Sequence, residues 1–192
     1  MRFTIGLALL ALGSLVFSGC GSPSAPKGST DVPVPPVKAA EATADGPNVD
    51  LKPVLAAGLI DAQGQSVSAD AYQGKLIGLY FSAHWCPPCK VFTPKLVALR
   101  DAHADRFEVL FVSADNSAEE MAGYMQEAQM KWPAVKFDAP ARMKIAADLG
   151  IESIPTLIVL KPDGQIITRE GYNEVDRQGA GALTAWQSAA GK

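Results

Sequence analysis

The stretch SAHWCPPCK, residues 82–90, joins two different hydropathy patterns. Before it, residues 76–81 form a short apolar run of the kind that makes a buried central strand. After it, from Pro87 to about residue 104, apolar residues recur at helical spacing. The stretch therefore predicts the end of a strand and the start of a helix, with Cys86 and Cys89 at the junction.

This position predicts reactive cysteines. Backbone N–H groups at a helix N-terminus have no partners within the helix, and together with the helix dipole they favour an anion on Cys86. Cysteines in such settings have a pKa of about 3.5–7.5, whereas a free thiol has one of about 8.5. Cys89 lies on the same side of the first turn, where it can attack a mixed disulfide formed at Cys86. We expect Cys86 to be the nucleophile and Cys89 the resolving cysteine.

Two other uses of the cysteine pair remain open. A structural disulfide across so short a loop would remove little chain entropy from the unfolded state. A zinc site usually needs four ligands, and the chain after Cys20 offers only this pair with His84 and His103, and no second C-x-x-C. Redox chemistry is therefore the interpretation that the pair favours.

The chain around this junction alternates strands and helices, which predicts an α/β fold with a mixed sheet. An N-terminal β-hairpin is expected from residues 54–61 and 65–68 around a Gln63-Gly64 turn. Residues 165–169 follow a turn at 161–164 and are expected to pair antiparallel with the strand before it. The other strands are expected at 76–81, 109–112 and 156–160, and the helices at 87–104, 118–130, 141–149 and 176–190.

The N-terminus predicts export. After Arg2, residues 5–17 form an apolar run that is too short, at about 13 residues, to cross about 30 Å of hydrocarbon as a helix. Residues 16–20, VFSGC, resemble a bacterial lipobox, which implies cleavage after a signal peptide at 1–19 and lipid modification of Cys20. An ordinary signal peptide cut nearby, or a thiol awaiting an intermolecular partner, are the alternatives for Cys20. The absence of Asp at positions 21 and 22 favours the outer membrane.

Composition divides the rest of the chain into a tether and a domain. Residues 20–52 are rich in Pro, Ser, Ala and Val and cannot bury enough apolar surface to offset their ordering entropy, which predicts a flexible tether. Residues 53–192 have the length of one ordinary domain. The formal net charge is −3 and no basic block is present, so we expect no nucleic acid partner.

Two segments carry a resemblance to a known family. Residues 80–96, YFSAHWCPPCKVFTPKL, and residues 107–115, FEVLFVSAD, resemble the tryparedoxin and nucleoredoxin branch of the thioredoxin superfamily. The resemblance implies a thioredoxin-like fold, with a central sheet flanked by helices, and reversible dithiol–disulfide exchange. Trp85 matches the tryptophan that precedes the nucleophile, and Pro94 matches the proline that kinks the active-site helix.

A third segment, SIPT at residues 153–156, matches the family's substrate loop. Pro155 takes the place of the family's cis-proline, which implies that the backbone at Ile154 and Pro155 contacts an extended polypeptide while Cys86 attacks its disulfide. The alternative is an ordinary trans proline at the start of a strand.

One position departs from the thioredoxin pattern. Thioredoxins carry a buried acid six residues before the nucleophile that helps to deprotonate the resolving cysteine, and here that position is Tyr80. The base for Cys89 is therefore open. Tyr80, His84 and Lys90 are candidates for tuning a cysteine pKa, although the side chains of His84 and Lys90 can equally lie on the surface beside the pocket.

Together these features predict an exported, lipid-anchored thiol–disulfide oxidoreductase that faces the periplasm. It would reduce protein disulfides, or supply electrons to an envelope partner, with no cofactor beyond the redox-active disulfide Cys86–Cys89 and no metal. The expected partners are protein dithiol or disulfide substrates, a second redox protein that renews the pair, and the membrane through the N-terminal lipid. A copper-handling lipoprotein with this fold and a disulfide-forming oxidase are the alternatives.

Overall fold

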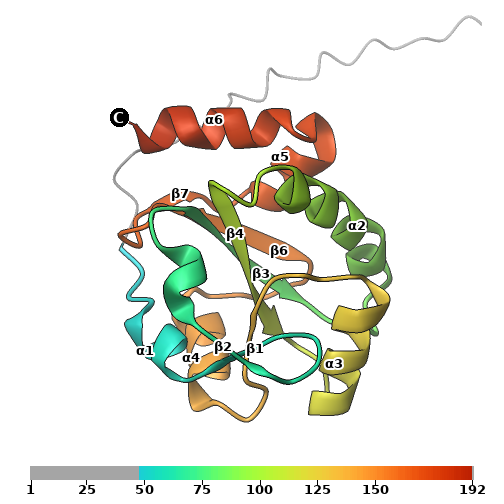
Figure 1. Cartoon of the computed structure of the whole chain (residues 1–192). Helices are drawn as coiled ribbons and strands as arrows, with labels where there is room; N and C mark the ends of the chain where they lie inside the picture. Colours follow the sequence, from blue (N-terminus) through green and yellow to red (C-terminus); the bar gives the residue numbers. More distant parts are fainter. Residues whose placement is uncertain (1–47, 192) are drawn as a thin grey trace, which may run out of the picture. The chain divides into compact units, whose positions relative to one another are not determined.

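Seven strands form one mixed sheet in the computed structural model of the protein, which describes residues 48–191 (Figure 1). The strand order is β2-β1-β5-β4-β3-β6-β7. β3 (Leu76–Ser82) and β4 (Phe107–Ser113) run parallel at the centre, and β6 (Thr156–Leu160) pairs antiparallel with the other edge of β3. The remaining strands are short, namely β1 (Leu59–Ile60), β2 (Ser66–Val67), β5 (Ala134–Val135) and β7 (Ile166–Thr168).

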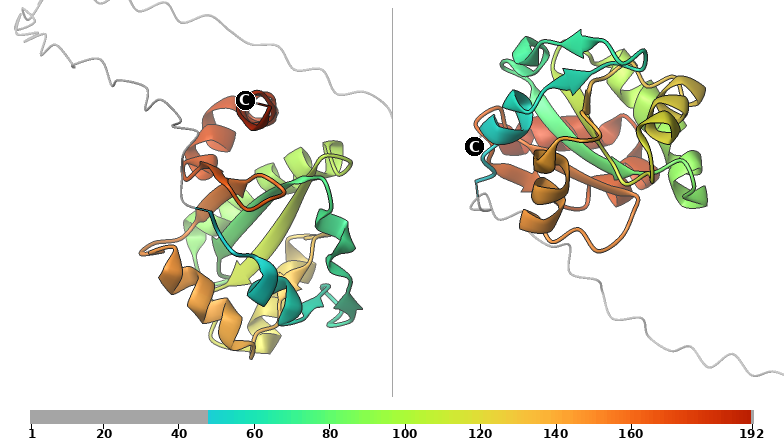
Figure 2. Two further views of the ribbon diagram at one scale, coloured as in Figure 1. Left: turned by 90° about the vertical axis from the view of Figure 1, so that its left-hand side faces the viewer. Right: turned by 90° about the horizontal axis from the view of Figure 1, so that it is seen from below.

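Helices cover both faces of this sheet (Figures 1 and 2). One core lies under α2 (Pro87–Ala102), α3 (Ala118–Glu127), α5 (Gly171–Gln178) and α6 (Gly181–Ala190). The other lies under α1 (Lys52–Ala56), the 3-10 helix η1 (Ala69–Tyr72) and α4 (Pro140–Asp148). Every residue of β3 and β4 is buried, as is typical of central strands that are covered on both faces.

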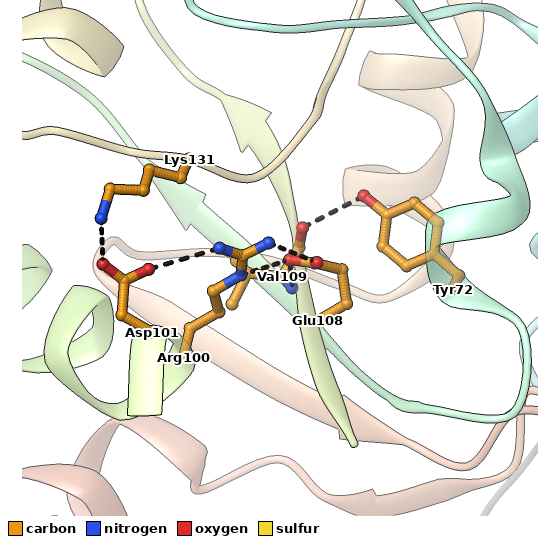
Figure 3. A network of polar contacts seen from close by, with 6 residues as sticks. All are labelled: Tyr72, Arg100, Asp101, Glu108, Val109 and Lys131. Carbon is orange, nitrogen blue, oxygen red and sulfur yellow. Dashed lines mark hydrogen bonds and ion pairs between the residues drawn. The ribbon is translucent and has the colours of Figure 1, made fainter. Parts of the chain in front are cut away.

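A buried ion pair ties α2 to the start of β4 (Figure 3). The guanidinium of Arg100 donates to both carboxylate oxygens of Glu108, at 2.9 and 2.6 Å, and these hydrogen bonds raise the pKa of Arg100. Asp101 contacts both Arg100 and Lys131, and its hydrogen bond from Lys131 lowers the pKa of its carboxyl. Because Glu108 is 2 % exposed, its charge depends on Arg100 for compensation.

The packed structure begins earlier than the predicted boundary at residue 53. Asn48 forms a bridge to Gln165, the Val49 N–H donates to the Gly164 carbonyl, and Leu51 is buried. Residues 48–52 therefore belong to the packed domain and not to the predicted tether, because the side chains of Val49 and Leu51 join the core under α1 and α4. The predicted signal peptide, Cys20 and the tether up to residue 47 lie outside the described residues.

The predicted N-terminal hairpin is present but shorter than expected. Leu59 pairs with Val67 and Ile60 with Ser66. The start of the expected first strand is helical instead, because Pro53 fits the first turn of a helix and Asp50 accepts a hydrogen bond from the Lys52 N–H.

The predicted closing helix at residues 176–190 is two helices. α5 ends and α6 begins around Gly179, whose φ of +53° lies in the left-handed region that favours glycine. The other predicted strands and helices are confirmed to within a few residues at each end. Among residues 48–191, no helix combines the length and apolar character needed to cross a bilayer.

Candidate functional site

The cysteine pair lies where β3 gives way to α2, as its position in the sequence predicts. Cys86 is the N-cap of α2, and its Sγ accepts a hydrogen bond from the Cys89 N–H at 3.3 Å. Pro87 and Pro88 occupy the first two helical positions, which need no N–H groups within the helix. The two cysteines form a disulfide with Cα atoms 5.2 Å apart, and both are buried.

Three hydrogen bonds hold the loop that carries Cys86 against the loop after β4. The Ala114 N–H donates to the Ser82 carbonyl at 2.8 Å, and the His84 N–H donates to a carboxylate oxygen of Asp115 at 2.7 Å. The Trp85 indole N–H donates to the Ala114 carbonyl at 3.3 Å. Trp85 is therefore fixed at one edge while 54 % of its surface remains exposed beside the cysteines.

The loop before β6 meets the cysteines from the other side. The Ile154–Pro155 peptide bond is cis, as the resemblance predicts. The Ile154 carbonyl oxygen lies 3.8 Å from Cys86 Sγ, and the Ile154 side chain packs against a small buried cluster of Ala83, Cys86 and Cys89. The structure thus brings together Trp85, Ile154 and the cysteine pair, which are far apart in the sequence.

A groove of about 550 Å³ opens beside this junction. Trp85, Ile154 and Met143 of α4 are among the residues that line it, and Met143 is 61 % exposed. Arg142 lies in the wall, where its guanidinium donates to the Ser113 and Phe137 carbonyls at 2.6 and 2.7 Å. Burial lowers the pKa of Arg142. The groove therefore offers a largely apolar surface with a fixed cation in its wall.

Buried hydroxyl groups lie behind the cysteines. Thr93 donates to the Cys89 carbonyl at 2.8 Å, and its Oγ1 lies 2.8 Å from the Tyr80 hydroxyl and 2.6 Å from the Tyr124 hydroxyl. Because the single Thr93 proton goes to Cys89, the two tyrosines donate to Thr93. The Tyr124 hydroxyl also lies 3.1 Å from Ser82 Oγ, which then donates to it.

Within this network the Tyr80 hydroxyl is a hydrogen-bond donor. Burial raises the pKa of Tyr80 well above its usual range, and the neighbouring Tyr124 raises it further. Its phenol therefore stays protonated at neutral pH and donates to Thr93. Tyr80 therefore places a neutral donor where thioredoxins carry an acid, and whether it tunes a cysteine pKa stays a prediction.

His84 and Lys90 lie on the surface beside the pair, where they contact each other and Glu127. His84 Nε2 lies 3.2 Å from Lys90 Nζ and 3.3 Å from a carboxylate oxygen of Glu127. Their side chains are each 42 % exposed, and that of Glu127 is 61 % exposed. Whether His84 or Lys90 tunes a cysteine stays a prediction.

Sequence reasoning singled out neither the hydroxyl partners nor the groove. Thr93 carried a usable signal, because a residue four places after Cys89 lies on the same helix face. Ser82 and Asp115 stand just after buried apolar runs, at the strand ends where sites of α/β folds gather. Tyr124, Glu127, Arg142 and Met143 carry no local signal. Within residues 48–191, no three His, Cys, Asp or Glu side chains are placed to share a metal ion.

Comparisons with known proteins agree with this geometry. A family described as thioredoxin-like matches residues 74–166. Human nucleoredoxin is 43 % identical over 130 residues, which cover 65 % of this chain and 29 % of the relative. The chain thus spans about three-tenths of the length of such curated relatives.

The chain covers a larger share of similar proteins of known structure. A thioredoxin from Wuchereria bancrofti is 38 % identical with a TM-score of 0.59, covering 69 % of this chain and 95 % of that structure. Tryparedoxin I from Leishmania major is 32 % identical with a TM-score of 0.61, covering 67 % of this chain and 90 % of that structure. The chain belongs to the thioredoxin-like family, a family of thiol–disulfide oxidoreductases.

Proposed function

We propose that the protein exchanges dithiols for disulfides with polypeptide substrates, through Cys86 and Cys89. The observation that carries this proposal is the position of Cys86. It caps the N-terminus of α2, where a thiolate is stabilised, and its Sγ lies 3.8 Å from the carbonyl of Ile154, next to the cis-proline. The nucleophile and the backbone that would hold a substrate strand are therefore adjacent.

The chemistry needs no electron carrier other than the two sulfurs. In the reducing direction, the Cys86 thiolate attacks a substrate disulfide, forms a mixed disulfide and releases one substrate thiolate. The Cys89 thiolate then attacks Cys86 Sγ, which releases the second substrate thiolate and forms the Cys86–Cys89 disulfide. Two electrons pass to the substrate, and two protons taken up from solvent leave it as a dithiol. A second dithiol protein must then reduce the pair again.

The substrate would lie across Trp85 and the loop before β6. The backbone at Ile154 and Pro155 can pair with an extended segment, as in other cases of strand addition. The groove between Trp85 and Met143 can then receive an apolar side chain of that segment. Extended, disulfide-bearing polypeptides are therefore the substrate class that we propose.

The chain would act outside the cytoplasm, on a lipid anchor. The apolar run at residues 5–17 and the VFSGC motif support export and lipidation at Cys20. The Pro-rich segment that follows would hold the domain away from the membrane, facing the periplasm. Gly21 and Ser22 favour the outer membrane.

Reduction of a disulfide-bonded protein such as insulin tests the activity. The reduced chain should cleave the interchain disulfides with dithiothreitol as the electron source, and Cys86→Ser should abolish this cleavage. When reduced Cys89→Ser is freed of dithiothreitol and mixed with insulin, it should accumulate a mixed disulfide, visible as an added mass that later dithiothreitol removes, because no resolving thiol remains. Cleavage by Cys86→Ser faster than cleavage by dithiothreitol alone would contradict the proposal.

A further inference from the structure

Three ionisable side chains from three different elements meet on the surface beside the cysteines. His84 lies in the loop before α2, Lys90 in the first turn of α2, and Glu127 at the end of α3. The Glu127 carboxylate lies 3.3 Å from His84 Nε2 and 4.0 Å from Lys90 Nζ, and the two nitrogens lie 3.2 Å apart. We call these three residues the Glu127 cluster.

The charges of Lys90 and Glu127 each lie at the unfavourable end of their own helix. Lys90 is the fourth residue of α2, where the helix dipole disfavours a cation, and no acidic residue lies in that first turn. Glu127 is the last residue of α3, where the dipole disfavours a carboxylate, and no basic residue lies in that last turn. Neither charge is stabilised by its own helix, so each gains from its contact with the other, in addition to the solvent that screens both.

The cluster is attached to both sides of the cysteine pair. Lys90 directly follows Cys89, and its N–H donates to the Cys86 carbonyl at 3.2 Å. The His84 ring lies edge-on to Tyr124, 6.1 Å between centroids, and Tyr124 belongs to the hydroxyl network behind Cys89. Lys90 therefore lies one helical turn after Cys86 along α2, and His84 lies two residues before Cys86.

We propose that Glu127 is a positioning residue that holds Lys90 and His84 and offsets the charge of Lys90, and thereby sets how readily Cys86 ionises. This inference rests on the proposed exchange activity and deepens it. Without Glu127, the Lys90 cation near Cys86 loses its partner and favours the thiolate. Because only the reduced pair carries a thiolate, the dithiol form gains stability over the disulfide, and the pair becomes a stronger oxidant.

Other groups around Cys86 must stay unchanged in the test. They are the Asp115 carboxylate, which accepts from the His84 N–H, the hydroxyls of Tyr80 and Tyr124, and Glu152 in the wall of the groove. Glu127→Gln preserves size and touches none of them. Since the Glu127 side chain is 61 % exposed, the variant should fold as the unaltered chain does.

The matched control is Asp176→Asn. Asp176 pairs with Lys95, another lysine of α2, at 2.5 Å, and the exposure of this pair, 46–47 %, is close to that of the Glu127 cluster. The control therefore removes a carboxylate from an α2 lysine without altering the charge next to Cys86.

Two measurements on the full chain separate the possible outcomes. In the first, iodoacetamide alkylation of Cys86 in the reduced chain is followed against pH by mass spectrometry. In Glu127→Gln, the midpoint should move to lower pH, and the rate below the midpoint should rise about two- to fivefold, as expected for one exposed ion pair. In the second, the ratio of reduced to oxidised pair at fixed glutathione poise should rise by a similar factor.

Added Lys90→Gln should reverse most of this change, and Glu127→Asp should restore part of the unaltered behaviour. Asp176→Asn should leave both measurements unchanged. If Glu127→Gln matches the unaltered chain, or Lys90→Gln does not reverse its effect, the role of Glu127 is refuted while the exchange activity stands. If the unaltered chain shows no reversible exchange with glutathione, the proposed function itself fails.

Discussion

Thr93→Val should destabilise the domain by removing the centre of the buried hydroxyl network. Thr93 is fully buried, and its hydroxyl accepts from Tyr80 and Tyr124 and donates to the Cys89 carbonyl. Valine has nearly the same shape, so the change removes hydrogen bonds with little effect on packing. Tyr124 keeps its contact with Ser82, but the Tyr80 hydroxyl loses its partner inside the core.

The magnitude follows from that orphaned hydroxyl. A buried polar group left without a partner costs about 1–3 kcal/mol, so we expect Thr93→Val to lower the free energy of unfolding by about 2 kcal/mol. Tyr80→Phe breaks the same hydrogen bond but leaves Thr93 with Tyr124, so it should cost about 1 kcal/mol. The double variant should cost about 1 kcal/mol less than the sum, because it leaves no unpaired phenol.

Urea unfolding of the oxidised chain at pH 7 measures these differences as shifts in midpoint at constant slope. Thr184→Val, at an exposed position of α6, is the control and should change stability by less than about 0.5 kcal/mol. The prediction is contradicted if the losses in free energy of unfolding from Thr93→Val and Tyr80→Phe simply add in the double variant. It is also contradicted if Thr93→Val costs no more than the Thr184→Val control, because the hydroxyl network would then not stabilise the domain.

Three further perturbations test other parts of the structure. Burial raises the pKa of Tyr80, so above about pH 10 the unfolded chain releases a phenolic proton that the folded chain keeps, and stability falls with rising pH. Tyr80→Phe should reduce that loss by up to about 1.4 kcal/mol per pH unit in urea unfolding between about pH 10 and 11, and an unchanged slope would contradict it. Arg100→Met leaves buried Glu108 uncompensated and should cost about 3–5 kcal/mol in urea unfolding, whereas Arg100→Met with Glu108→Leu should recover most of it. Met143→Glu should lower kcat/KM for insulin about tenfold, the equivalent of losing about 1.4 kcal/mol of apolar contact between groove and substrate, and should leave the reduction potential unaltered. If kcat/KM equals that of the unaltered chain, the groove is not part of the substrate site.

Much of the fold is predictable because its central strands are continuous apolar runs. Residues 76–81 and 156–160 match β3 and β6 closely, since a strand buried on both faces needs apolar residues at every position. β5 has only two residues and no pattern of its own, so tertiary pairing alone defines it. The break between α5 and α6, by contrast, is predictable from the sequence, because Gly-Ala-Gly at 179–181 carries a turn signal.

Part of the candidate site is likewise predictable from the sequence and part is not. Local spacing is enough to predict that Cys86 and Cys89 act as a pair. The family resemblance is enough to predict a cis-proline at Pro155, and the structure confirms the cis bond. Glu127 and Arg142 reach the site from α3 and α4, and only the packing of these helices on the sheet brings them there. A sequence pattern reports the neighbours of a residue along its own element, whereas these contacts join elements far apart in the chain.

The most direct measurement is the equilibrium reduction potential of the Cys86–Cys89 pair, titrated with glutathione or dithiothreitol. We expect a reversible two-electron couple near the value of about −270 mV that is typical of thioredoxin, which fits a reductase fed by another dithiol protein. A value near about −120 mV would make the protein an oxidant instead. Absence of any reversible couple would contradict exchange through these two cysteines.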